Sequence, residues 1–311
     1  MLQDIKMMVK RYMQEKDGTN STVSSSVVQN DAIPQLSAMN MIVSVCNQKG
    51  GCGKTTTAVN LASSLSYKGF KVLLVDLDPQ AHAGLGLGVD VESLEKSIYD
   101  VLINGCGIES VIHKSSVENM DIVPSNTMLS GAQLELADML GRETVLRTAF
   151  RKLRLLKAYD YIFLDCSPSL NLITINALVA SNAVLIPLQT HYYSLEGMKE
   201  LFCTIDIVRE RLNPDITILG ILATLFDTRI KVNHVMLEQI RSYFKDMVFK
   251  TIIHNNVRLC EAPMHKKPIH IYDPRSRGAK DYALLADEVA AITTKSGALR
   301  EDADVQEHSI A

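Results

Sequence analysis

The stretch KGGCGKTT at residues 49–56 decides the fold, because it lies between an apolar run, IVSVC at residues 42–46, and a helical pattern. Residues 55–67 carry small and apolar side chains at the spacing of one helix face, and Gly69 follows as a stop signal. A glycine-rich turn between a buried strand and a helix gathers backbone N–H groups at the positive end of the helix dipole. The stretch is therefore predicted to bind phosphate.

Each residue type in this loop fits phosphate chemistry. Glycine leaves no Cβ to obstruct an anion that approaches the backbone amides. Lys54 is expected to reach the β- and γ-phosphates of ATP, and the Thr55 hydroxyl to bind Mg²⁺. The loop departs from the usual GxxxxGK[ST] pattern, because Gln48 occupies the first glycine position and a second lysine opens the loop. The expected nucleotide contacts are Lys49, Gly50, Gly51, Cys52, Gly53, Lys54, Thr55 and Thr56.

Further apolar runs alternate with helical segments along the chain. They lie at residues 71–75, 161–164, 184–188 and 216–225. Near-continuous apolar strands separated by helices indicate an α/β fold, a mostly parallel twisted sheet with helices on both faces, as in P-loop NTPases. Residues 166–195 carry no Asp, Glu, Lys or Arg, but prolines and asparagines interrupt them. We predict a buried helix and a buried strand there rather than a membrane span.

Three regions differ in composition. Residues 1–40 combine a short amphipathic pattern with a stretch rich in Ser, Thr, Asn and Gln, which predicts a flexible N-terminal extension. An arm that contacts a partner or DNA is the alternative for this region. Residues 41–296 form the predicted ATPase domain, with a last helix at about 280–294, and residues 297–311 are predicted to form a polar, acidic tail.

Charge and cysteine usage point to a soluble cytoplasmic protein. The formal net charge is −3, so any nucleic-acid binding requires a local basic patch. The six cysteines include no CxxC pair and several lie in apolar runs, which predicts reduced, buried thiols.

KGGxGKTT after an apolar strand resembles the deviant Walker A motif of the ParA/MinD superfamily. This superfamily includes the ParA/Soj partition ATPases, the MinD division-site ATPases and the nitrogenase iron proteins. The resemblance implies that Lys49 crosses a dimer interface to the partner's nucleotide, so that ATP binding is tied to formation of a homodimer. A simple surface charge is the alternative interpretation of Lys49. Similarity to ParA/Soj extends over about residues 41–292, including segments at 124–126, 131–136, 258–263 and 272–279.

Two acidic segments also resemble this family. DLDPQ at residues 76–80 resembles the family segment whose second aspartate lies near the attacking water, which implies that Asp78 acts in hydrolysis. For Asp76, a structural role is the alternative to a role in hydrolysis. YIFLD at residues 161–165 resembles a Walker B strand, which implies that Asp165 holds Mg²⁺ and that residues 166–169 sense the γ-phosphate.

Three functions remain open at this stage. A ParA-type switch binds DNA without sequence preference. It hydrolyses ATP slowly, and a ParB-like protein accelerates this hydrolysis. A MinD-like switch would need a basic amphipathic helix at the C-terminus, but residues 280–294 place Asp281, Asp287 and Glu288 on the expected polar surface. An iron–sulfur protein would need paired cysteines at a dimer axis, with Cys106 and Cys166 as the candidates.

A local basic patch favours the DNA-binding, nucleoid-associated alternative, with no membrane expected. Residues 245–280 carry eight Lys and Arg against three acids, a net charge of +5. Arg229 and Arg258 match positions that ParA/Soj proteins use for DNA contact. The sequence departs from the family at residues 254–256 and 264–266, where one expected arginine is missing and a lysine is gained. The predicted DNA contacts are Arg229, Arg258, Lys250, Lys266 and Lys267.

Overall fold

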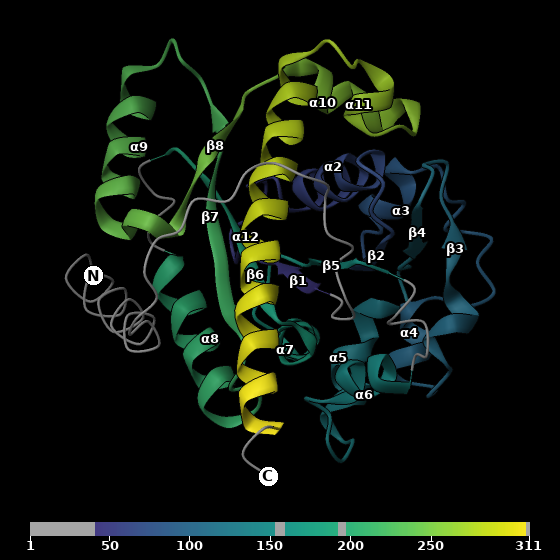
Figure 1. Cartoon of the computed structure of the whole chain (residues 1–311). Coiled ribbons are helices and arrows are strands. Elements are labelled where there is room, and N and C mark those ends of the chain that lie inside the picture. The colour runs from purple at the N-terminus through teal and green to yellow at the C-terminus, as the bar shows by residue number, and fades with distance from the viewer. Residues whose placement is uncertain (1–40, 153–158, 192–196, 309–311) are drawn as a thin grey trace.

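The computed structural model describes residues 41–152, 159–191 and 197–308. Eight strands form one sheet in the order β3-β4-β2-β5-β1-β6-β7-β8 (Figure 1). Neighbouring strands are parallel except for β3 and β4. The strands are β1 Met41–Val45, β2 Val72–Leu77, β3 His113–Lys114, β4 Met120–Val123, β5 Tyr161–Cys166, β6 Ala183–Gln189, β7 Thr217–Phe226 and β8 Val248–His254.

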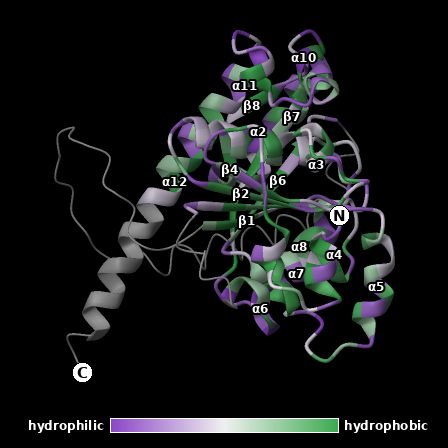
Figure 2. Ribbon diagram, turned by 90° about the vertical axis from the view of Figure 1, so that its right-hand side faces the viewer, coloured by the Kyte–Doolittle hydropathy of each residue, from purple (hydrophilic) through white to green (hydrophobic). Residues whose placement is uncertain are grey.

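Helices cover both faces of the sheet, so the predicted fold class is confirmed. One apolar core lies under α2 (Lys54–Tyr67), α11 (Ile269–Tyr272) and α12 (Arg277–His308). A second core lies on the opposite face, under helices α4 to α9. Figure 2 shows the strands as a layer with α2 on one side and α7 and α8 on the other. The remaining helical elements are α3 His82–Gly86, α4 Ile98–Leu102, η1 Ile108–Val111, α5 Leu129–Ala137, α6 Val145–Lys152, α7 Leu172–Ala180, α8 Met198–Arg211, α9 Lys231–Phe244, η4 Lys245–Met247, α10 Val257–Glu261 and η5 Ala262–His265.

The apolar runs of the sequence become the central strands because both faces of the sheet are covered. All residues of β2 and β5 are buried, as expected for parallel strands between two helical layers. The uncharged stretch at residues 166–195 contains α7 and β6, as predicted. No helix within the described residues is both long and apolar enough to cross a membrane.

The C-terminal segment differs from the sequence-based prediction. α12 runs from Arg277 to His308, past residue 297 where the acidic tail was expected to begin. Asp281 was placed on the polar surface of this helix, and this placement was wrong. It is only 4% exposed and accepts a hydrogen bond from the backbone N of His254 at 2.9 Å. The predicted extension at residues 1–40 lies outside the described residues.

The connections of β1 and β6 create a topological switch point in the sheet. The chain passes from β1 through α2 to β2 on one side, and from β6 through α8 to β7 on the other. β1 and β6 are neighbours, so the winding direction reverses between them. In open α/β sheets, ligands bind at such a switch point. The loop between β1 and α2 therefore lies where a ligand is expected.

Candidate functional site

The phosphate loop has the backbone that its glycines predict. Gly51 and Gly53 have φ of 67° and 87°, a left-handed conformation that strains a residue with a side chain. A Cβ built on Gly50 or Gly51 would meet no described atom within 4 Å, so this side of the loop is open. α2 begins after Gly53 with no acidic residue in its first turn. Its first amides are therefore placed to bind an anion.

Lys54 lies inside the loop rather than on its surface. The residue is only 7% exposed, and its Nζ donates a hydrogen bond to the backbone O of Lys49 at 3.0 Å. The backbone N of Lys49 donates to Asn47 Oδ1 at 2.9 Å, so both backbone groups of Lys49 are engaged within the loop. Lys49 itself is part-exposed. One lysine therefore lies within the loop and the other opens it.

Two buried carboxylates lie side by side next to the loop. Asp76 on β2 and Asp165 on β5 are register partners, and both are fully buried. Burial, followed by the charge of Asp76, raises the pKa of Asp165 well above its usual range. The Thr55 hydroxyl and the Lys54 ammonium oppose this rise. The structure thus brings Lys54, Thr55 and Asp165 together.

Asp165 and Thr55 fit a bound Mg²⁺. Neither carboxylate oxygen of Asp165 has a hydrogen-bond partner of good geometry among the described residues. The Thr55 hydroxyl and the Lys54 ammonium offset only part of the cost of burying this carboxylate, and a bound cation would offset more of it. In the described chain, no group of three or more His, Cys, Asp or Glu could hold a metal by itself. Mg²⁺ typically combines one or two carboxylates with phosphate oxygens and water, so this sparse protein ligand set suits it.

Asp76 anchors the loop that carries Asp78. Its Oδ1 accepts a hydrogen bond from the backbone N of Asp78 at 3.1 Å, and its Oδ2 accepts from Ala83 at 3.1 Å and Gly84 at 3.2 Å. Burial raises the pKa of Asp76 to about 7, although these backbone N–H groups oppose the rise. The geometry therefore favours the structural role of Asp76. Asp78 is part-exposed, and its charge also raises the pKa of Asp165, so the two carboxylates interact electrostatically.

The cysteines do not form the surface pair that an iron–sulfur cluster at a dimer axis requires. Cys166 is 1% exposed, and its Sγ lies 2.9 Å from that of Cys46. All six cysteines of the described chain are free thiols. The prediction of buried thiols was wrong for Cys203 and Cys260, which are exposed.

Most of the predicted DNA contacts lie at the carboxyl edge of the sheet. Arg229 follows β7 and Arg258 lies in α10 after β8. A backbone hydrogen bond of 2.9 Å between Asn255 N and Phe226 O joins these two loops. Lys266 and Lys267 are exposed directly after η5, which packs on α10. Lys250 is set apart: it lies within β8, and its backbone N donates to Glu288 Oε1 on α12 at 2.7 Å.

The two arginines already have carboxylate partners. Arg229 lies 2.6 Å from Asp227, and Arg258 lies 2.8 Å from Glu261 and 3.4 Å from Asp273. The hydrogen bonds from Arg229 lower the pKa of Asp227 to about 2. Both guanidinium groups are exposed, and ion pairs that water reaches contribute little stability. Asp227 and Glu261 are near neighbours of these arginines in the sequence, whereas the pairing of Arg258 with Asp273 appears only in the tertiary structure.

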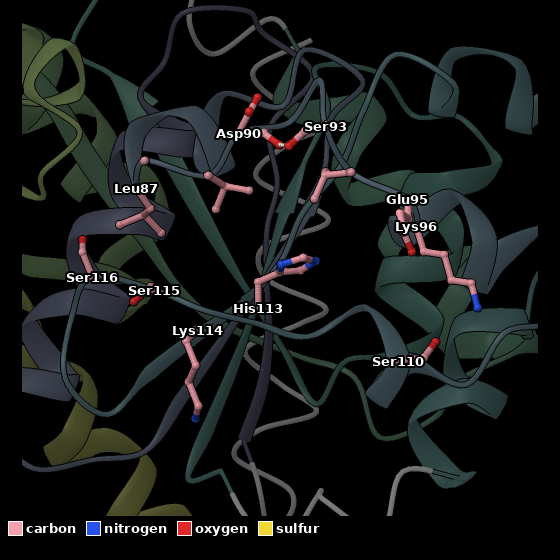
Figure 3. A pocket seen from close by; sticks show the side chains of 13 residues that line it. Leu87, Asp90, Ser93, Glu95, Lys96, Ser110, His113, Lys114, Ser115 and Ser116 are labelled. Atoms are coloured by element: carbon pink, nitrogen blue, oxygen red, sulfur yellow. Dashed lines mark hydrogen bonds between the residues drawn. The ribbon is translucent and has the colours of Figure 1, made fainter.

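A hollow of about 690 Å³ lies elsewhere, between the segment that follows α3 and the edge strand β3 (Figure 3). Two of its polar side chains have partners within the protein: Ser110 Oγ donates to Gly107 O at 2.7 Å, and Lys114 pairs with Asp121 at 3.0 Å. None of its lining residues belongs to the phosphate loop. We therefore assign the nucleotide site to the loop and not to this hollow.

The fold and the loop define a P-loop ATPase. The family model described as "AAA domain" matches residues 40–218. The sporulation initiation inhibitor protein Soj of Bacillus subtilis is 48% identical over 253 residues, which cover 81% of this chain and 99% of the relative. The chromosome partitioning protein ParA of Myxococcus xanthus is 47% identical over 80% of this chain and 87% of the relative. The chain belongs to the ParA/Soj family of partition ATPases.

A solved structure supports the same assignment of fold and site. Cobyrinic acid a,c-diamide synthase from Mycobacterium smegmatis, with a bound ATP analogue and magnesium, superposes with a TM-score of 0.70 at 32% identity. The match covers 80% of this chain and 93% of that protein. The name of that protein refers to a different reaction, so the shared fold and nucleotide do not by themselves define the biological output.

Proposed function

We propose that the chain is an ATP-dependent dimerising switch that binds DNA without sequence preference and partitions or positions a cargo, a plasmid or a chromosome. The observation that carries the nucleotide-binding part of the proposal is the buried Asp165 carboxylate beside Lys54 and Thr55, where a cation brought by a nucleotide would offset the cost of burial. ATP and Mg²⁺ are the cofactors, in line with the ligands of the M. smegmatis protein. The family relationship supplies the partition function.

The site residues divide the chemistry of hydrolysis. The amides of residues 50–56 bind the phosphate chain, and Lys54 stabilises charge on its terminal groups. Thr55 and Asp165 hold Mg²⁺, which neutralises charge on the phosphates when bound. Asp78 orients the attacking water, since it is part-exposed near Asp165 on a loop that Asp76 fixes.

Lys49 ties nucleotide binding to assembly in this proposal. It opens the phosphate loop and is part-exposed, whereas Lys54 occupies the interior. A second protomer facing the loop would bring its own Lys49 to the phosphates. ATP would then stabilise the dimer because each triphosphate supplies charge that the partner's lysine neutralises.

The basic loops provide the DNA surface. Arg229, Arg258, Lys266 and Lys267 lie on neighbouring segments at the edge of the sheet that also carries the nucleotide site. Dimerisation would present two such patches to one duplex, and two linked contacts raise affinity steeply. A ParB-like protein would accelerate the slow hydrolysis of ATP and so release the dimer from DNA. The protein would therefore act in the cytoplasm, bound to the nucleoid.

A pair of measurements tests this proposal. Light scattering after size exclusion gives the oligomeric state, and co-sedimentation with DNA gives binding, each with ATP, with ADP and without nucleotide. We expect dimers and DNA binding with ATP alone. Lys54→Ala should lose nucleotide binding, and Lys49→Ala should bind ATP but remain monomeric. ATP-independent DNA binding, or a dimer of Lys49→Ala that equals the wild type, would contradict the switch.

The same preparations distinguish a DNA-binding protein from a membrane-binding one. Sedimentation with anionic lipid vesicles should show no ATP-dependent binding, because α12 exposes Asp287 and an anionic surface repels acidic side chains. Binding to vesicles without binding to DNA would favour a MinD-like protein instead.

A further inference from the structure

Two carbonyl groups of the phosphate loop are held from outside by side chains of the neighbouring strands. Gln189 Nε2, at the end of β6, donates a hydrogen bond to Gly51 O. Thr224 Oγ1, near the end of β7, donates to Cys52 O at 2.8 Å. Gln189 and Thr224 are register partners in the sheet. Two consecutive peptide groups of the loop are therefore anchored by one pair of adjacent positions.

These anchors fix the direction of the loop's N–H groups. A trans peptide group is planar, so the C=O of one residue and the N–H of the next point in opposite directions. A hydrogen bond that draws Gly51 O towards β6 turns the N–H of Cys52 away from the strand. The bond to Cys52 O does the same for the N–H of Gly53. Both N–H groups thus point to the side of the loop where the phosphates are expected.

The loop needs such anchors because glycine does not hold a peptide orientation by itself. Gly51 and Gly53 flank Cys52 at φ of 67° and 87°, and glycine populates both signs of φ with little preference. Thr224 is 2% exposed and Cys52 is fully buried. Water therefore cannot replace a missing hydrogen bond to the carbonyl of Cys52.

We propose that Gln189 and Thr224 are positioning residues for phosphate binding, which orient the amides of Cys52 and Gly53 without touching the nucleotide. This inference rests on the proposed function in one respect, namely that the loop binds the phosphate chain of ATP. It adds that affinity for phosphate depends on two side chains from strands far from the loop in sequence. The Thr224 hydroxyl has the larger effect, because its bond is buried.

The test compares Thr224→Val, which keeps the shape but removes the donor, with Thr224→Ser, which keeps the hydroxyl. Thr217→Val is the matched control on the same strand, where the threonine is exposed. Calorimetry measures the binding of ATP, ADP, pyrophosphate and adenosine to each full-length protein. We expect Thr224→Val to bind the three phosphate compounds about tenfold more weakly, with adenosine unchanged. Thr224→Ser and Thr217→Val should bind all four ligands like the wild type.

Gln189→Leu is a second test variant, and it changes a residue that is not buried. Gln189 is part-exposed, so this variant should fold even if Thr224→Val does not, and it should weaken the same three ligands by severalfold. Unchanged pyrophosphate affinity in the variants that fold, an equal loss for adenosine, or failure of Thr224→Ser to restore binding would overturn the inference. Lys54→Ala separates the two claims: normal ATP binding by Lys54→Ala would overturn the proposed function itself. If Lys54→Ala loses binding while Gln189→Leu and Thr224→Val keep it, only the positioning role is wrong.

Discussion

Replacing Asp165 by Asn should stabilise the nucleotide-free protein while removing its Mg²⁺ ligand. The carboxylate is fully buried, has no hydrogen-bond partner of good geometry among the described residues, and lies beside Asp76. Its charged form is therefore disfavoured in the folded state. Asn has nearly the same shape but carries no charge, so the substitution removes this cost.

The neighbouring carboxylate shows what burial costs at this edge of the sheet. The pKa of Asp76 rises from 3.8 to about 7, which corresponds to about 4 kcal/mol of unfolding free energy at about 1.4 kcal/mol per pH unit. The pKa of Asp165 moves in the same direction for the same main cause, burial. The buried amide of Asn would also lack a partner, which costs part of the gain. We expect Asp165→Asn to be more stable than the wild type at pH 8, because burial and the charge of Asp76 both disfavour the Asp165 carboxylate.

The pH dependence gives the direction of the test. A folded pKa raised above the unfolded value means that the folded state binds more protons, so stability is full below the unfolded pKa and falls as pH rises through the folded pKa. The advantage of Asp165→Asn should thus be near zero at about pH 4 and grow towards pH 8. Urea unfolding in EDTA at a series of pH values measures it.

Asp215→Asn is the matched control, because Asp215 is exposed and its replacement should change stability little at any pH. Mg·ATP should stabilise the wild type and not Asp165→Asn, since ligand binding to the folded state alone raises stability. A variant that is no more stable than the wild type at pH 8 would refute the reasoning about the buried carboxylate.

Three further substitutions address hydrolysis, DNA binding and the core. Asp78→Ala should still bind ATP and dimerise but turn over at least about a hundredfold more slowly, and normal phosphate release would exclude its role. Arg258→Glu should weaken DNA co-sedimentation and lower the slope of log affinity against log salt by about 0.9 for each DNA phosphate that is no longer neutralised, with ATPase activity unchanged; an unaltered slope would remove Arg258 from the DNA surface. Leu61→Ala, at a fully buried position on α2, should cost about 2–5 kcal/mol in urea unfolding, whereas Leu134→Ala at a 77% exposed position should cost little.

Local patterns in the sequence were sufficient for the phosphate loop and the central strands. The loop, α2 and β1 are contiguous, so strand, turn and helix signals report on one another directly. Strands without a strong local pattern were missed. β3 has two residues, and β8 is an edge strand with polar side chains among its apolar ones, so neither produces a long apolar run.

By itself, the sequence determined the fold class, the family and the residues of the phosphate loop. Only the tertiary structure decided that Asp76 lies beside Asp165, that Asp281 is buried, and that Gln189 and Thr224 hold the loop. The physical reason is sheet register, together with the packing of helices and loops against the sheet. Contacts between neighbouring strands join residues that are distant along the chain, and the packing of both sheet faces selects that register, whereas no local pattern encodes it.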